Sequence, residues 1–279
     1  MKKFNAKDMK IGTSSALFGH PDERAYDECA KAGIAYMEMR VKDAIEDDLS
    51  ALAADWAQQK KWADDYQMGI WSLHLPYGQK WDISELHEEK RVTSLYRQEQ
   101  MIQQAAKIMN IQKVVLHPSY EPIREDERPL KKEACRKSLV QLGQSALQNG
   151  VTLAVECLPR TCLCNTIAET KEILSGIGNI GLCCDMNHLM KDYAEDFIRT
   201  FGNRIVTTHF SDYDRVDERH WMPGKGVNNW NKIFEALSDC SYEGPAIFEI
   251  AVRANEKRAT AAEIRACWDS LLDAYSAYC

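Results

Sequence analysis

The chain contains the four runs LAVECLPR (residues 153–160), GLCCDMNH (181–188), IVTTHFSD (205–212) and AIFEIAVR (246–253), in each of which a short apolar stretch meets a polar residue. These polar residues are Glu156, Asp185, His209 and Glu249. The first three are about 25–30 residues apart and the last about 40, which is roughly the length of one strand, its helix and the loops between them. The spacing therefore predicts consecutive strand–helix units, each with a polar group where its strand ends.

These four residues are predicted to share one partner. A polar or charged group at the end of a buried strand costs free energy unless something compensates for it, and the chain repeats this arrangement four times in succession. Three carboxylates and one imidazole suit a divalent cation that is bound mainly through oxygen. The sequence therefore predicts a metal site formed by Glu156, Asp185, His209 and Glu249.

The whole chain alternates between strand-like and helix-like stretches. Strands are predicted at Lys10–Ser14, Ile34–Met39, Met68–His74, Lys113–His117, Thr152–Glu156, Ile180–Asp185, Arg204–His209 and Ala246–Ile250. Helices are predicted at Asp22–Ala32, Asp47–Tyr66, Glu85–Met109, Lys131–Gln148, Thr166–Ser175, Asp192–Phe201, Trp230–Leu237 and Thr260–Ala277. This α/β pattern in 279 residues is typical of a (β/α)8 TIM barrel, which we expect to form one domain over residues 1–279. An open doubly wound sheet is the competing architecture, but no glycine-rich phosphate loop follows the first strand.

The composition limits the class of protein. With 45% hydrophobic and 28% charged residues, the chain is predicted to be a soluble globular protein. No apolar run reaches the roughly 20 residues that span a bilayer, and the start MKKFNAKDMK lacks the apolar region of a signal peptide. The ten cysteines include no C-x-x-C pair, so we expect reduced thiols in a cytoplasmic protein. The net charge of −7 argues against a nucleic-acid partner, and no membrane partner is expected.

Several histidines also lie where predicted strands end. His74 is in SLHLPY, His117 is in VLHPSY, and His188 follows Asp185 by three residues. Active sites of (β/α)8 barrels are built at the C-terminal ends of the strands, so we expect these histidines and the carboxylates to converge at one mouth. Glu38, in YMEMR, ends another predicted strand, and we expect it to be a solvated or structural glutamate.

The ligand types indicate a reaction. A cation held by carboxylates and an imidazole can chelate a carbonyl and the adjacent hydroxyl of a polyol, which acidifies the neighbouring C–H and helps an enediolate to form. Glu156 and Glu249, on two different strands, would flank such a substrate. A glutamate on each face suits epimerisation, whereas one glutamate that shuttles the proton on one face suits aldose–ketose isomerisation.

The motifs SLHLPY, VLHPSY, LAVECLPR, CCDMNH, THFSD and HWMPGKGVNNW resemble those of the xylose isomerase-like TIM-barrel superfamily, and the similarity runs from KIGTSS to AIFEIAVR. That superfamily includes sugar-phosphate isomerase/epimerases, ketose 3-epimerases, inosose-processing enzymes and apurinic-site endonucleases. For the epimerases, the resemblance implies that the four predicted ligands bind one divalent metal and that Glu156 and Glu249 also act as acid and base. It also implies substrate contacts for His188 and Arg215.

The resemblance thus implies a metal-dependent isomerase or epimerase that acts on a small-molecule sugar or polyol through a metal-stabilised enediolate. A lyase or dehydratase of an inositol derivative would use the same site chemistry. Mn²⁺ is the expected metal, with Mg²⁺, Co²⁺ and Zn²⁺ as the other candidates, because ligand type alone does not select among them. Association into a homo-oligomer stays open.

A zinc-dependent apurinic-site endonuclease is the main alternative. In that branch, histidines that match His74 and His117 join the carboxylates and a D-R-H element to hold three zinc ions, and this chain has Glu218-Arg219-His220 at the last position. The negative charge and the lack of basic, aromatic-rich insertions argue against a grip on duplex nucleic acid. We therefore favour the sugar enzyme, in which His74, His117 and His220 are expected to contact substrate hydroxyls.

Overall fold

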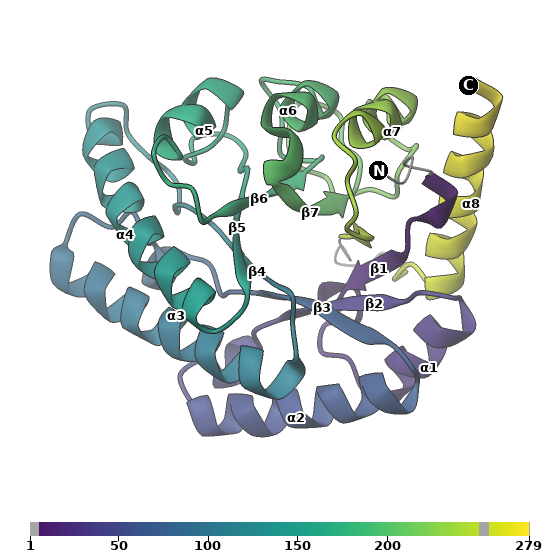
Figure 1. Ribbon diagram of the computed structural model, residues 1–279, viewed down its shortest axis with the longest axis horizontal. Helices are drawn as coiled ribbons and strands as arrows, with labels where there is room; N and C mark the ends of the chain where they lie inside the picture. The colour runs from purple at the N-terminus through teal and green to yellow at the C-terminus, as the bar shows by residue number, and fades with distance from the viewer. Residues whose placement is uncertain (1–5, 251–256, 279) are drawn as a thin grey trace.

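The computed structural model describes residues 6–250 and 257–278 and contains a closed barrel of eight parallel strands with helices around it (Figure 1). The strands are β1 (Ile11–Ser14), β2 (Tyr36–Arg40), β3 (Gly69–His74), β4 (Lys113–Leu116), β5 (Thr152–Glu156), β6 (Gly181–Asp185), β7 (Ile205–Phe210) and β8 (Ala246–Phe248). The α-helices are α1 (Glu23–Lys31), α2 (Leu49–Asp65), α3 (Glu88–Met109), α4 (Arg128–Gln148), α5 (Ile167–Ile173), α6 (Ala194–Phe201), α7 (Trp230–Asp239) and α8 (Ala261–Tyr278). Short 3-10 helices are η1 (Ala6–Asp8), η2 (Ser15–Phe18), η3 (Asp43–Ile45), η4 (Gln79–Trp81) and η5 (Gly202–Arg204). The predicted (β/α)8 barrel is confirmed.

The strands pair in chain order, and β8 returns to β1 to close the barrel. The closing pair includes Gly12 opposite Ile247. A Cβ atom at Gly12 would lie 2.9 Å from the backbone oxygen of Tyr36, so β1 needs glycine there to fit against β2. All five residues of β6 are buried, because the barrel interior covers one face of each strand and the helices cover the other.

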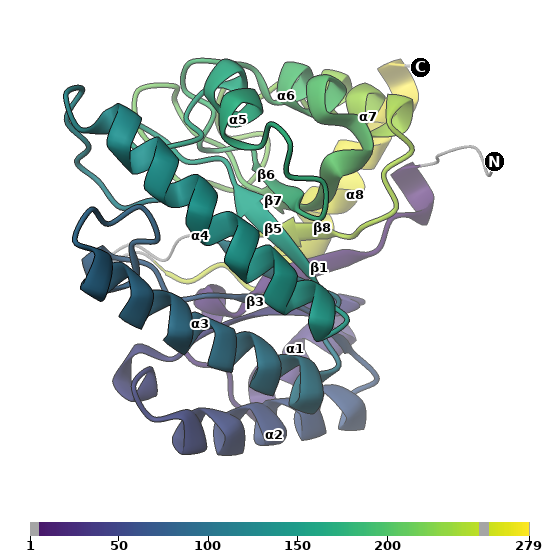
Figure 2. The same cartoon turned by 60° about the vertical axis from the view of Figure 1, so that its left-hand side comes forward.

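Side-chain caps determine where several helices begin. Asp22 accepts a hydrogen bond from the backbone of Ala25 at the start of α1, and Asp48 accepts from Ser50 and Ala51 at the start of α2. These caps satisfy N–H groups that have no partner within the helix. The helices then pack around the barrel, and Figure 2 shows α3 and α4 lying side by side on its outside.

The structure shifts some of the predicted boundaries. Helix α4 begins at Arg128 rather than Lys131, and Pro129 lies in its first turn, where a missing N–H costs nothing. Helix α3 begins at Glu88 rather than Glu85, because Glu85 accepts a hydrogen bond from the backbone of His87 and forms a turn. Strand β8 ends one residue before Glu249. The described residues contain no helix whose length and apolarity would let it cross a membrane.

Candidate metal centre

The four predicted ligands converge at the C-terminal ends of four neighbouring strands. Glu156 is the last residue of β5, Asp185 is the last of β6, and His209 is the next to last of β7. Glu249 directly follows β8. One ligand atom from each residue lies within 4.8 Å of those from the other three. The strand-end spacing thus brings these side chains together, and their role as metal ligands stays a prediction.

Nδ1 of His209 faces all three carboxylates of this cluster. It lies 3.0 Å from Oε1 of Glu156, 3.0 Å from Oε2 of Glu249 and 3.4 Å from Oδ2 of Asp185. Oδ2 of Asp185 is buried and has no hydrogen-bond partner among the described residues. Three carboxylates around one imidazole leave an excess of buried negative charge, which is costly without a counter-ion. The donor set therefore fits a divalent cation that prefers oxygen ligands.

Neighbouring histidines compensate part of the negative charge of the cluster. Burial opposes the charged form of Glu156, yet His209 and His117 beside it hold the pKa of its carboxyl well below its usual range. Burial also opposes ionisation of Glu249, and His209 again holds its pKa well below the usual range. Burial raises the pKa of Asp185. Without a metal ion, the imidazole of His209 thus supplies positive charge that a bound cation would replace.

Glu38, on β2, is buried against His209. Its Oε1 atom lies 2.9 Å from Nε2 of His209, and its Oε2 atom accepts a hydrogen bond of 2.6 Å from Oγ of Ser72. The expectation of a solvated glutamate is therefore wrong, and a structural role fits. The contact is an ion pair outside hydrogen-bond geometry, and a carboxylate beside one ring nitrogen of a histidine favours a metal at the other.

A second group of potential ligands shares Glu156 with the first. Nε2 of His74 and Nε2 of His117 each lie 3.1 Å from Oε2 of Glu156. Nδ1 of His74 lies 2.8 Å from the carbonyl oxygen of Leu75, which orients the ring. One ligand atom from each of the three residues lies within 4.8 Å of the others. Glu156 offers one oxygen to each group, so it would be a ligand common to both if each held an ion.

A third group consists of His188, Glu218 and His220, whose ligand atoms also lie within 4.8 Å of one another. Nε2 of His188 lies 3.1 Å from Oε2 of Glu218. The hydrogen bond from His188 lowers the pKa of Glu218 to about 2. Nδ1 of His188 lies 3.0 Å from the carbonyl oxygen of Cys157, which fixes the ring. The structure therefore places every histidine that was predicted to line the mouth beside a carboxylate.

A cavity of about 190 Å³ opens onto these three groups. Its lining includes His74, His117, Glu156, His188, Glu218, His220 and Glu249. Asp185 and His209 are fully buried and lie outside this lining. The ring of Tyr77 forms an aromatic wall and stacks on His117, with 4.6 Å between centroids and 17° between planes. A small polar ligand in this cavity would contact imidazole and carboxylate groups on several sides.

Arg215 lies outside the lining of this cavity. Its guanidinium carbon lies 3.9 Å from the ring centroid of Tyr193, and Nη2 donates to the carbonyl of Asp192 at 3.5 Å. Its contact with substrate stays a prediction. Arg160, which is not among the predicted site residues, does line the cavity, and its Nη1 atom lies 2.9 Å from Oε1 of Glu218. Its place shortly after β5 is the signal for it, because residues that follow barrel strands reach the mouth.

Comparison with known proteins places the chain near one family. A profile of the family described as xylose isomerase-like TIM barrel matches residues 26–270. Among curated proteins, a D-psicose 3-epimerase from Enterocloster bolteae is 29% identical over 119 residues, which are 40% of this chain. The chain spans 38% of the length of that relative.

Solved structures share the whole fold. A D-tagatose 3-epimerase-like protein superimposes with a TM-score of 0.82 and 20% identity, over 97% of this chain and 99% of the other. An L-ribulose 3-epimerase superimposes with a TM-score of 0.78 and 20% identity, over 97% of this chain and 96% of the other. At this identity the likeness concerns the fold.

Proposed function

Because the chain belongs to the xylose isomerase-like TIM-barrel family, we propose that it is a divalent-metal-dependent sugar isomerase or epimerase, with Mn²⁺ as the metal. The observation that carries this proposal is the placement of Glu156 at the end of β5 and of Glu249 directly after β8, with Nδ1 of His209 3.0 Å from an oxygen of each. The D-psicose 3-epimerase relative supports the choice of a ketose or related polyol as substrate.

In this proposal, the two glutamates move the proton. A divalent cation held by the four ligands supplies Lewis-acid polarisation of the substrate carbonyl, which acidifies the neighbouring C–H. One carboxylate takes that proton and leaves an enediolate, and the carboxyl group of the other glutamate gives a proton to the opposite face. The carbon is inverted, and exchange with water restores the starting protonation. Return of the proton on the same face to the neighbouring carbon would give isomerisation instead.

The histidines at the mouth hold the substrate in this proposal. His74 and His117 lie against Oε2 of Glu156. Substrate hydroxyls that form hydrogen bonds with these imidazoles in place of Glu156 would therefore be held beside the reacting carbons. His188 lies beside Glu218 on the other side of the cavity. Held substrate and fixed acid and base supply the proximity that proton transfer requires.

Solvent deuterium incorporation tests this proposal directly. The Mn²⁺-loaded protein is incubated in D₂O with D-fructose, D-psicose, D-tagatose, L-ribulose and a panel of inososes, and NMR locates the deuterium. Epimerisation places deuterium at the carbon next to the ketone, with product of inverted configuration, and a lyase would release water from an inosose. We expect Glu156→Gln and Glu249→Gln to slow exchange by at least about 100-fold. Exchange that persists in both variants contradicts the proposed acid and base, and Glu172→Gln, an exposed glutamate on α5, is the matched control.

A second candidate function rests on the two additional ligand groups. Together with the first group they form three adjacent clusters of potential ligands, which suits a three-zinc phosphodiesterase of the endonuclease type. Metal analysis of the purified protein distinguishes the two functions. We expect about one ion per chain for the sugar enzyme, whereas three ions together with cleavage of an abasic-site duplex would favour the phosphodiesterase.

A further inference from the structure

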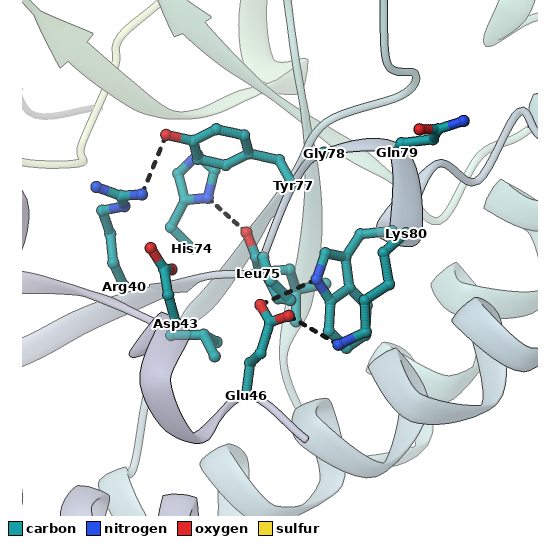
Figure 3. A pocket seen from close by; sticks show the side chains of 12 residues that line it. Arg40, Asp43, Glu46, His74, Leu75, Tyr77, Gly78, Gln79 and Lys80 are labelled. Atoms are coloured by element: carbon teal, nitrogen blue, oxygen red, sulfur yellow. Dashed lines mark hydrogen bonds and ion pairs between the residues drawn. The ribbon is translucent and has the colours of Figure 1, made fainter. Parts of the chain in front are cut away.

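A second cavity, of about 290 Å³, adjoins the first and shares His74 and Tyr77 with it (Figure 3). Its wall comes from the end of β2, from η3 and from the segment between β3 and α3. Its polar side chains include those of Arg40, Asp43 and Lys80. This second cavity therefore lies next to any ligand bound at the candidate metal centre, on the far side of His74 and Tyr77.

Arg40 lies at the rim where the candidate ligands converge. It is the last residue of β2 and pairs in register with His74 of β3. Its Nη2 atom donates a hydrogen bond of 3.0 Å to the hydroxyl of Tyr77, as Figure 3 shows. The ring of Tyr77 stacks on His117, whose Nε2 atom lies 3.1 Å from Oε2 of Glu156. These contacts connect Arg40 to the proposed reaction centre.

Arg40 differs from the other cations that line the two cavities. Nζ of Lys80 pairs with Glu46 at 2.8 Å and with Asp47 at 2.5 Å, and Arg160 pairs with three carboxylates. Across residues 6–250 and 257–278, no carboxylate oxygen lies within the 4.0 Å of an ion pair with Arg40. Most of its N–H donors are therefore available to a ligand.

Asp43 is the carboxylate of this cavity that has no cationic partner among the described residues, and its side chain points into the same space (Figure 3). Asp43 is exposed, whereas Arg40 is half-buried. Water and salt weaken an exposed charge more than a half-buried one. Asp43 therefore opposes an anion at Arg40 less than a buried carboxylate would, and its oxygens can accept bonds from hydroxyls.

We propose that Arg40 binds an anionic group of the substrate, a phosphate or a carboxylate, at the end of the molecule remote from the reacting carbons. This inference rests on the proposed function, because it assumes that the reacting carbons lie at Glu156 and Glu249. A planar guanidinium binds phosphate or carboxylate oxygens through two parallel N–H donors. The substrate class is thus a sugar phosphate or a sugar acid, and the second cavity holds its charged end.

Binding to the Mn²⁺-loaded protein tests this assignment, with D-fructose, D-fructose 6-phosphate and D-fructuronate as probes in calorimetry. We expect at least one anionic probe to bind roughly 10- to 100-fold more tightly than D-fructose, and the tighter one identifies the group. Arg40→Gln should abolish this difference, and Arg40→Lys should keep part of it. Lys61→Gln, at an exposed lysine of α2 that pairs with Asp65, and Tyr77→Phe, which keeps the guanidinium, should preserve it.

Two results would overturn the assignment: D-fructose binding as tightly as both anionic probes, or an anion preference that survives Arg40→Gln and so belongs to the metal centre. Deuterium exchange measured on the same samples separates this inference from the proposed function. If deuterium exchange occurs without any preference for the anionic probes, only the proposed role of Arg40 is contradicted, and the proposed function stands. An anion preference that Arg40→Gln removes, without exchange in any probe, supports the role of Arg40 and contradicts the enediolate chemistry.

Discussion

The two ring nitrogens of His209 face different carboxylates. Nδ1 lies among the three carboxylates of the candidate metal centre, whereas Nε2 lies 2.9 Å from Oε1 of Glu38. Glu38 is in turn held by Ser72, whose hydroxyl donates to its other oxygen. Oε1 of Glu38 and Nε2 of His209 are within ion-pair distance but outside hydrogen-bond geometry, so Glu38 acts on the ring of His209 through its charge, which favours a metal at the other ring nitrogen. Glu38 is therefore a positioning residue for the metal site.

Glu38→Gln is predicted to weaken the binding of Mn²⁺ by roughly 10- to 100-fold, because the neutral amide removes the negative charge 2.9 Å from Nε2 of His209. Calorimetric titration of the metal-free protein with Mn²⁺ measures this change without reference to activity. Ser72→Ala is the control, since it removes only the bond to Glu38, and it should weaken binding by less. Equal affinities in the wild type and Glu38→Gln would rule out the positioning role.

The candidate ligands could be predicted from the sequence, whereas the residues that contact and position them could not. Glu156 and Asp185 end apolar strands at regular spacing, and that pattern places them at one mouth. Glu38 stands between Met37 and Met39 in a strand whose three central residues are all buried. Burial on both faces removes the alternation that would show which way the side chain points. Arg160 follows β5 closely enough to be expected near the mouth, but its φ of 49° and its pairing with Glu218 are not predicted by strand spacing.

At the scale of elements, α1 helps to start α8, which is its neighbour in the ring (Figure 1). The Glu28 carboxylate on α1 accepts a hydrogen bond of 2.8 Å from the backbone N–H of Ala261, the first residue of α8. It also accepts two bonds from Arg258, at 2.8 and 3.2 Å. An N–H in the first turn of a helix lacks a partner within the helix. One side chain of α1 therefore both caps α8 and pairs with the segment that leads into it.

This contact predicts a pH-dependent loss of stability. The hydrogen bond from Arg258 lowers the pKa of Glu28 below its ordinary value of 4.5 in the folded protein. Its stabilisation is therefore fully present above pH 4.5 and is lost as the pH falls through the lower, folded pKa. We expect Glu28→Gln to cost about 1 kcal/mol at pH 7 and less as the pH drops below 4.5, in urea unfolding followed by circular dichroism.

Glu133→Gln is the comparison for Glu28→Gln, because Glu133 forms an exposed pair with Lys137 on α4 at 3.4 Å. We expect it to change the free energy of unfolding by less than about 0.5 kcal/mol at pH 7. A cost for Glu28→Gln that stays constant from pH 7 to below pH 4.5 would show that its carboxylate charge does not matter.

The order of strands and helices could be predicted because apolar periodicity is a local property of the chain. The ends of the helices depend on single side chains instead. Asp22 caps α1 close to its predicted start, and Pro129 allows α4 to begin earlier than the apolar pattern indicates. The shared cavity wall at His74 and Tyr77 depends on how several loops fold over the mouth. That arrangement is a property of the whole barrel and has no local sequence signal.

At the scale of the whole molecule, the closed barrel holds mutually repelling carboxylates in place. Glu156 and Asp185 are fully buried at the ends of adjacent strands, and the rigid strands prevent them from moving apart. Such an arrangement lowers the stability of the metal-free protein and raises its affinity for a cation. Binding of a cation should relieve this repulsion, stabilise the folded protein and raise its melting temperature.

Chelation and a single substitution test this coupling together. At a free Mn²⁺ concentration of 100 times Kd, binding stabilises the fold by about 2.7 kcal/mol, which corresponds to a Tm shift of roughly 5 °C for a chain of 279 residues. Scanning calorimetry with and without EDTA measures the shift. Asp185→Asn should abolish this Tm shift because it removes a metal ligand. It should also raise the Tm of the metal-free protein, because the new amide group can donate to the neighbouring carboxylates. The side-chain oxygen at this position would keep the hydrogen bond that it accepts from the backbone N–H of Asn187. A lower Tm for metal-free Asp185→Asn than for the metal-free wild type would mean that the carboxylate cluster is not strained.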